Sequence, residues 1–168
     1  MGNKVLIFIS VLVTFLGMTF SGSDSYAQAK GSSVIVNFAY AQETIHQGGV
    51  WKIYLSVSDP EGNMSRIVFH LEQDGGTRFS RPDTTYLKKG MEKGFTGYFA
   101  FPTTGSTDNL WGEELNLNVA ILDRRGNELK TLDFPLKFDG EAMKPLPPDL
   151  EKDLNQRLGT IHIGFIPG

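Results

Sequence analysis

The stretch WKIYLSVSDPEGN, residues 51–63, contains the two signals that decide the fold of this chain. Its first half places Trp51, Ile53, Leu55 and Val57 at every second position. A period of two puts alternate side chains on opposite faces of an extended backbone, so the pattern predicts a β-strand with one buried face. The second half, Asp-Pro-Glu-Gly-Asn, is rich in residues that favour turns, and it predicts that the strand ends there.

The same alternation recurs as far as residue 138, and we expect one face of every strand to turn towards a shared apolar interior. In the first strand, Val34, Val36, Phe38 and Tyr40 occupy one face. In the last, Pro135 points away from the apolar face, and a proline without an amide proton predicts a sheet edge or a bulge. Six segments besides residues 51–57 carry the pattern: Val34–Tyr40, Ile67–Leu71, Thr84–Leu87, Phe95–Phe101, Leu115–Ile121 and Leu132–Phe138.

Turn residues separate these segments at a spacing typical of a β-sandwich. Two of the turns, residues 59–63 and 123–127, share the form Asp-x-x-Gly-Asn. We expect each Asp to accept hydrogen bonds from backbone amides two residues further on, each Gly to adopt a positive φ, and each turn to close a tight hairpin. Calcium binding is the alternative for both Asp residues, but calcium takes about six to eight oxygen ligands and each turn offers too few.

Residues 51–63 and 115–127 resemble the strand-plus-turn segments of bacterial immunoglobulin-like and fibronectin-III-like domains. The resemblance covers roughly residues 33–140 and implies an all-β, immunoglobulin-like antiparallel sandwich of about seven strands in a domain spanning residues 30–140. The chain lacks the cysteine pair and the tyrosine corner of antibody domains, and Trp51 lies on the second strand instead of the third. No functional residue can therefore be carried over from that family.

The pattern changes in residues 141–168. The prolines of residues 145–148 predict a stiff linker, and a proline also suits the first turn of a helix. Leu150, Leu154 and Leu158 recur at intervals of four, which predicts a short C-terminal helix of about three turns that ends at the following glycine. We expect this leucine stripe to close an open end of the sandwich, with contact to a partner protein as the alternative, since a short helix is marginal without packing.

Three alternating residues, Ile161, Ile163 and Phe165, predict a final strand near the C-terminus. We expect this strand to pair with an exposed sheet edge. Residues 141–168 would then pack on the sandwich as a linker, a helix and a terminal strand.

The N-terminus has the features of an export signal. A basic residue precedes an apolar run, Val5–Leu16, that is too short to span a membrane comfortably, and Ala27-Gln28-Ala29 supplies small residues at the positions that a signal peptidase recognises. We expect residues 1–29 to be a signal peptide, no membrane span after its cleavage, and a periplasmic or extracellular location. An uncleaved anchor is the alternative.

Composition excludes several classes of protein. The chain contains no cysteine, which excludes disulfides, thiolate zinc sites and a lipid-modified N-terminal cysteine. Its 16 basic and 19 acidic side chains give a formal net charge of −3, which argues against general nucleic-acid binding.

If successive strands run antiparallel, one end of the sandwich collects the loops at residues 59–63, 88–93 and 123–127. Loops that converge on a rigid scaffold are common binding sites. Their mild excess of positive charge suits an acidic partner or a glycan, whereas the alternative treats them as solvated loop-tip charges. The candidate ligand-binding residues at this end are Asp59, Glu61, Lys88, Lys89, Lys93, Arg124 and Arg125.

The other end collects residues 43–49, 73–83 and 102–114, and it adds one more candidate for ligand binding. Trp111 lies in a polar loop, where an exposed indole would stack on a sugar ring. The favoured alternative is that Trp111 folds back and caps the core, because an indole offers a large apolar area for burial.

No catalytic residue, metal site or cofactor is predicted. The sequence has no nucleophile elbow, no zinc-binding His-Glu-x-x-His helix and no phosphate-binding glycine loop, and its histidines, His46, His70 and His162, are scattered. We therefore do not expect an enzyme.

These observations predict an exported, non-catalytic binding or assembly module of the cell envelope or the secreted fraction, with an envelope protein or a glycan as partner. A carbohydrate-recognition or enzyme-accessory domain that uses loop aromatics such as Trp111 is the alternative. A third hypothesis makes the C-terminal helix and strand a docking element. Truncation after Gly140 separates it from the others, and we expect the tail to complete the fold.

Overall fold

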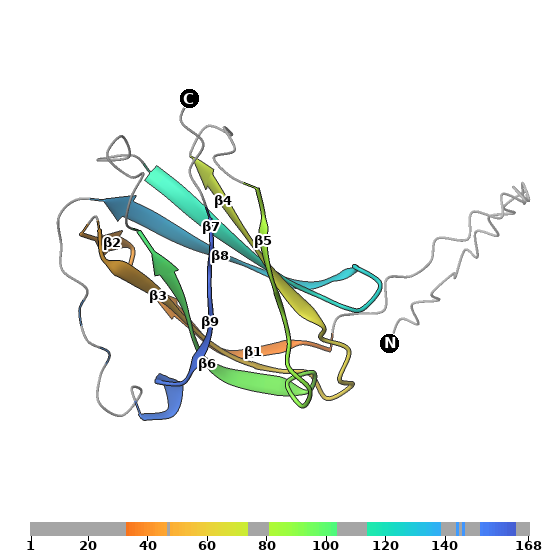
Figure 1. Ribbon diagram of the computed structural model, residues 1–168. Helices are drawn as coiled ribbons and strands as arrows, with labels where there is room; N and C mark the ends of the chain where they lie inside the picture. The colour runs from red at the N-terminus through yellow and green to blue at the C-terminus, as the bar shows by residue number, and fades with distance from the viewer. Residues whose placement is uncertain are drawn as a thin grey trace, which may run out of the picture. The chain divides into compact units, whose positions relative to one another are not determined.

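The structure is a computed structural model that describes residues 33–46, 48–73, 81–103, 114–138, 144, 146 and 152–163. The expected signal peptide, residues 1–29, and Trp111 lie outside these ranges. The described residues are mostly strand, so the all-β prediction is confirmed (Figure 1). They form β1 (Ile35–Ala41), β2 (Thr44–Ile45), β3 (Val50–Ser58), β4 (Arg66–Gln73), β5 (Asp83–Tyr86), β6 (Gly94–Pro102), β7 (Glu114–Leu122), β8 (Glu128–Phe138) and β9 (Arg157–Thr160).

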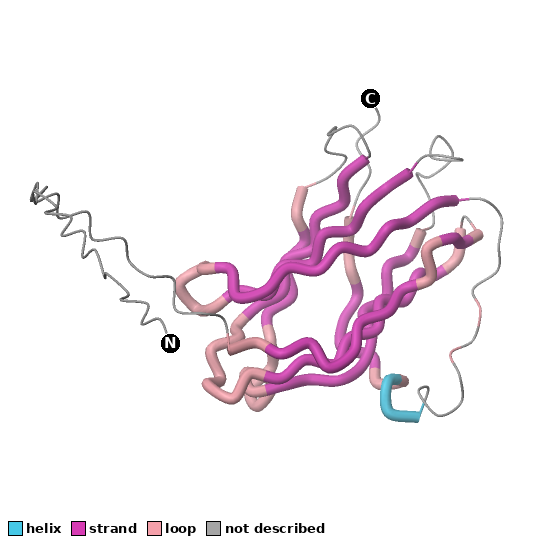
Figure 2. The backbone as a smooth tube through the Cα atoms, turned by 180° about the vertical axis from the view of Figure 1, so that it is seen from behind, coloured by secondary structure: helices cyan, strands magenta, loops and turns pink. Residues whose placement is uncertain are grey.

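The strands form two sheets, in the orders β1-β3-β6-β9 and β2-β8-β7-β4-β5. Figure 2 shows the two sheets as separate layers. Most neighbouring strands are antiparallel, but β2 pairs with β8, and β6 with β9, in parallel. Each of the seven predicted segments contains a strand, and β2 and β9 are additional. The sheets therefore differ from the expected arrangement of seven antiparallel strands, because two additional short strands, β2 and β9, pair in parallel with sheet strands.

The core lies between the sheets and is built from the alternating residues of β3, β4, β6, β7 and β8. Trp51 is fully buried, and its Nε1 donates a hydrogen bond of 2.7 Å to the backbone oxygen of Gln42. The inward faces predicted for these five strands are confirmed. Among the fully buried side chains are Ile53, Leu55, Ile67, Phe69, Leu71, Phe99, Phe101, Leu117 and Phe138.

The first strand departs from the predicted pattern. The register of β1 against β3 shifts between Val36 and Phe38, as in a β-bulge. A bulge inserts an extra residue, so the residues after it change faces. Val34 is buried in the core, whereas Phe38 packs against Tyr54 in a separate apolar cluster and Tyr40 is 40% exposed. The prediction that all four alternating residues of this strand share one face is therefore wrong.

The predicted C-terminal helix is also shorter than expected. Only residues 152–154 are helical in the described part of this segment, and Arg157 and Leu158 already belong to β9. Leu154 packs with Tyr54 in the separate apolar cluster, while Leu158 packs against the main core. The three-turn helix with a single leucine stripe is thus wrong. Within the described ranges, no helix has the length and hydropathy needed to cross a membrane.

The last strand joins a sheet edge as predicted, but it lies earlier in the chain. β9 pairs with β6, and the pairing continues after it, because the amide of Ile161 donates to the backbone oxygen of Ala100 at 2.8 Å. Ile161 and Ile163 are buried without being part of a strand. The open edge of β6 explains the shorter helix, since backbone pairing and burial there outweigh a weak local helix preference.

Candidate functional site

The loops at residues 59–63, 88–93 and 123–127 meet at one end of the sandwich, as predicted. The amide of Asp59 donates to the backbone oxygen of Lys93 at 2.9 Å, which joins the first loop to the second. The third loop lies nearby, because Arg124 contributes to the electrostatic environment of Glu92. The structure therefore brings seven of the eight candidate ligand-binding residues together, and Trp111 lies outside the described residues.

The two Asp-x-x-Gly-Asn turns have the predicted local geometry. The carboxylate of Asp59 accepts from the amides of Glu61 at 3.1 Å and Asn63 at 2.7 Å. The carboxylate of Asp123 accepts from the amides of Arg125 and Asn127, both at 2.8 Å. The glycine in each turn has a positive φ, 70° in the first and 91° in the second.

The two turns nevertheless connect different kinds of strand pair. The turn at residues 123–127 closes the antiparallel hairpin of β7 and β8. The turn at residues 59–63 carries the chain from β3 in one sheet to β4 in the other, so the predicted hairpin is wrong there.

Within the described ranges, no group of three or more His, Cys, Asp or Glu side chains forms a potential metal site.

Asp59 is the structural anchor of this end. Its side chain is fully buried and also accepts a hydrogen bond from the hydroxyl of Ser33, just before β1. Burial of the carboxylate favours its neutral form, but the hydrogen bonds from Ser33 and from the amides of Asn63, Glu61 and Met64 outweigh burial and lower the pKa of Asp59. The carboxylate therefore fixes the turn to the start of β1.

The other carboxylates of this end are also engaged within their own loops. The side chain and amide of Asn127 are the main groups that lower the pKa of Asp123. The amides of Glu92 itself and of Gly90 lower the pKa of Glu92, with smaller contributions from Arg124 and Lys89. Glu61 accepts a hydrogen bond of 2.9 Å from the side-chain amide of Asn63.

The cations at this end point outward. We call the five cationic side chains of the three loops the basic loop end; all are exposed, and within the described ranges none of them forms a salt bridge. Two of them lie close enough to Glu92 to affect its ionisation. The three loops thus carry five exposed cations against four carboxylates, each of which accepts a hydrogen bond within its own loop. The basic loop end consists of Lys88, Lys89, Lys93, Arg124 and Arg125.

Replacing Asp59 by alanine is expected to lower the free energy of unfolding by about 2 kcal/mol, because the amides of Glu61 and Asn63 lose their acceptor in a buried turn. Urea unfolding measures this change. Asp123→Ala is the matched control: it breaks the same turn motif at an exposed position, where water replaces the carboxylate. Equal losses in the two variants would contradict the anchoring role of Asp59.

The same variant tests the pH dependence of stability. The pKa of Asp59 in the folded state lies below its ordinary value of 3.8. In the pH range where this carboxyl titrates, the unfolded state therefore binds more protons than the folded state. The contribution of Asp59 is fully present above the unfolded pKa and disappears as the pH falls through the folded pKa. Asp59→Ala should therefore flatten the loss of stability below about pH 4, while Asp123 and Glu92 retain part of the slope.

The three histidines lie on different elements of the fold, after β2, on β4 and after β9. His70 lies on β4 with its Nδ1 3.4 Å from the carboxylate of Glu72. His46 and His162 are exposed, and the amide of His162 donates to Asp83 at 2.7 Å.

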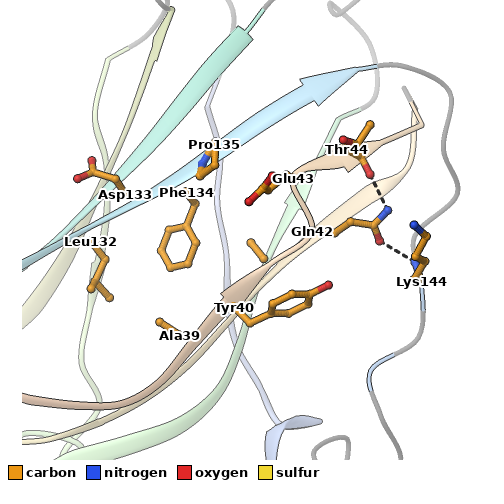
Figure 3. A pocket seen from close by; sticks show the side chains of 11 residues that line it. Ala39, Tyr40, Gln42, Glu43, Thr44, Leu132, Asp133, Phe134, Pro135 and Lys144 are labelled. Atoms are coloured by element: carbon orange, nitrogen blue, oxygen red, sulfur yellow. Dashed lines mark hydrogen bonds between the residues drawn. The ribbon is translucent and has the colours of Figure 1, made fainter.

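A groove that the sequence did not predict lies between β1 and β8 (Figure 3). This lateral groove has a volume of about 500 Å³. Beside it, Gln42 is buried: its side-chain amide donates to the backbone oxygen of Thr44 at 2.5 Å, and its side-chain oxygen accepts from the amide of Lys144 at 2.6 Å. Gln42 therefore holds the point where the chain crosses from one sheet to the other. The groove is lined by residues 39–44, residues 132–135 and Lys144.

Two sequence signals could have indicated the lateral groove. Ala39 and Ala41 place small side chains where the other strands carry large ones, and Pro135 marks an edge in β8. Neither signal is specific without the knowledge that β1 and β8 lie in different sheets.

No protein-family model matches the sequence, and no curated protein resembles it closely enough to count as a relative, so the function is argued from the geometry of the site.

Proposed function

We propose that this chain is an exported, non-catalytic binding module whose basic loop end docks on an acidic surface of a cell-envelope protein. One observation carries the proposal: the carboxylates of the three loops are engaged within those loops, while the five cations are exposed and form no salt bridge in the described ranges. A protein with a formal net charge of −3 thereby carries a local excess of exposed positive charge at this end. Such a surface favours the approach of an acidic partner and repels a basic one.

The loops are held in place before any partner binds. The carboxylate of Asp59 joins the first loop to Ser33, and the amide of Asp59 joins it to Lys93. The amide of Ser65 donates to the backbone oxygen of Leu122, next to the third loop, and the amide of Leu87 donates to Ser65 next to the second. A preorganised surface loses less conformational entropy on binding than mobile loops would.

The proposal includes an immunoglobulin-like topology, which the strand order supports. The order β1-β3-β6 corresponds to strands A, B and E of that fold, and β8-β7-β4 corresponds to G, F and C. In this assignment β2 is a second part of strand A that changes sheet, and β9 occupies the place of strand D. The loops at the ends of such sandwiches are where these domains bind their ligands. Export is supported by the signal-like residues 1–29.

The double variant Arg124→Ala with Arg125→Ala tests the basic loop end. The mature protein, residues 30–168, is used to capture its partner from an envelope fraction, and affinity is then measured at low and high salt. We expect the variant to bind about tenfold more weakly at low salt and to lose most of the salt dependence, because exposed charges act mainly on the association rate.

The matched control, Lys137→Ala with Lys152→Ala, removes two exposed positive charges elsewhere, one of them 3.7 Å from Glu114. We expect the control to bind like the wild type. The proposal is wrong if the two double variants bind equally, or if the captured partner presents no acidic surface.

The alternative, carbohydrate recognition, has support in a second hollow of about 500 Å³ beside the paired ends of β3 and β6. Neutral polar side chains line much of it, and the hydroxyls of Ser56 and Thr96 lie 2.9 Å apart there. Glycan binding that survives the Arg124 and Arg125 substitutions would favour this alternative over the basic loop end.

A further inference from the structure

We infer that the lateral groove is a second binding site, which takes an extended peptide segment of a partner protein as an added strand on the open edge of β8. This site is independent of the basic loop end, because it lies between the sheets at β1 and β8 and uses none of the five cations. The inference rests on the backbone of β8, on the small residues of β1, and on the short strand that already occupies part of the same edge.

The backbone of β8 has an open edge beside the groove. On one side β8 pairs with β7 along its length, but on the other its only partner among the described strands is β2, at Lys137 and Phe138. The amide of Lys137 donates to the backbone oxygen of Glu43 at 2.7 Å, so it points to the β2 side. Main-chain groups of alternate residues point to the same edge of a strand. The amides and carbonyls of Asp133 and Thr131 therefore point to the open side.

Pro135 is compatible with this arrangement. It lies in the same alternate series, so its missing amide leaves the ladder with β7 intact. Its carbonyl points to the open edge together with the groups of Asp133 and Thr131. An added strand would thus find two amides and three carbonyls in a row.

The groove also provides an apolar wall for an inserted side chain. Ala39 and Ala41 line it from β1, and Leu132 and Phe134 line it from β8. In Figure 3 the ring of Phe134 is directed into the space between the two strands. The small alanines leave that space open, so an aliphatic residue of the added strand can fill it. Tyr40, which is 40% exposed, stands at the rim.

The strand β2 shows which kind of occupant this edge accepts. It is an extended segment of two residues that pairs in parallel with β8 at Lys137 and Phe138, beginning two residues after Pro135. An added peptide extends the same ladder towards Thr131. Main-chain hydrogen bonds provide affinity in this mode of recognition, and alternate side chains in pockets provide specificity. The expected ligand is therefore a short extended segment with alternating aliphatic residues.

The probe is a displayed library of random heptapeptides, selected on the mature protein, residues 30–168. We expect enriched peptides with alternating aliphatic residues, and we expect their binding to slow hydrogen exchange at the amides of Thr131 and Asp133. Thr131→Pro removes one edge amide and should weaken binding at least about tenfold. Thr131→Ala is the matched control, because it keeps that amide and should bind normally.

A second variant, Ala39→Phe, fills the groove from β1 without changing any residue of β8 and should also abolish binding, whereas Ala39→Ser should not. Circular dichroism confirms that each variant folds. The double variant at Arg124 and Arg125 should bind the peptides normally, which separates this site from the basic loop end. The inference is overturned if no peptide is enriched, if Thr131→Pro and Ala39→Phe bind as well as the wild type, or if light scattering shows a dimer that Thr131→Pro dissociates.

Discussion

A chain that ends at Gly140 is expected to aggregate instead of forming a sandwich. This truncation removes β9, which covers one edge of β6, and it removes Ile161 and Ile163 from the core. It also removes Leu154 and Leu158, which pack on the two faces of the same sheet. Burial of four such side chains is worth on the order of 8 kcal/mol, which is comparable with the whole stability of a small domain.

Size-exclusion chromatography and far-ultraviolet circular dichroism of residues 30–140 and 30–168 measure this effect. We expect the longer chain to be monomeric and rich in strand, and the shorter chain to elute as aggregate. A soluble, folded monomer of residues 30–140 would show that the tail is dispensable, and it would revive the hypothesis that the tail is a docking element.

Gly97→Ala is expected to be a severely destabilising single substitution. Gly97 has a φ of +154°, and a Cβ atom at this position would lie 2.2 Å from the backbone oxygen of Gln156 and 2.9 Å from Cγ of Leu158. That same oxygen accepts a hydrogen bond of 2.8 Å from the amide of Tyr98. The added methyl group therefore pushes the segment before β9 away from β6. We expect a loss of more than about 3 kcal/mol in the free energy of unfolding.

Gly90→Ala is the matched control. Gly90 also has a positive φ, +97°, but a Cβ atom there would have no neighbour within 4 Å. Only backbone strain remains, which costs about 1 kcal/mol. Urea unfolding of both variants gives the comparison, and similar losses would mean that β9 does not depend on close contact at Gly97.

The strands with large alternating side chains are predictable because their signal is local. Trp51, Phe69 and Leu117 lie in runs where every second residue is apolar, and burial follows directly from that period. The face of Phe38 is not predictable, because nothing in the sequence before it distinguishes a bulge from a regular strand. The extent of the C-terminal helix is unpredictable for another reason: Leu158 fits a helical period, but the edge of β6 offers its backbone a partner.

The candidate site is predictable in its position and less so in its chemistry. The three loops lie together because consecutive strands reverse direction, and this holds even where the chain changes sheet at Asp59. Asp59 and Glu61 are among the predicted ligand-binding residues, but their carboxylates accept hydrogen bonds within their own loop. The lateral groove forms because the chain passes from one sheet to the other at Gln42, between β1 and β2. No local sequence pattern predicts that crossing.

The parallel pairing of β9 with β6 also bears on when this protein can fold. Gly159 pairs with Phe99, so β9 is needed to complete a sheet whose first strand, β1, begins at Ile35 and whose neighbouring strand, β6, lies some sixty residues before β9. Contacts between such distant parts of a chain form slowly. A nascent chain therefore cannot complete this sheet until β9 has been synthesised. That delay fits the export that we propose, in which the polypeptide is threaded through a narrow channel before it folds.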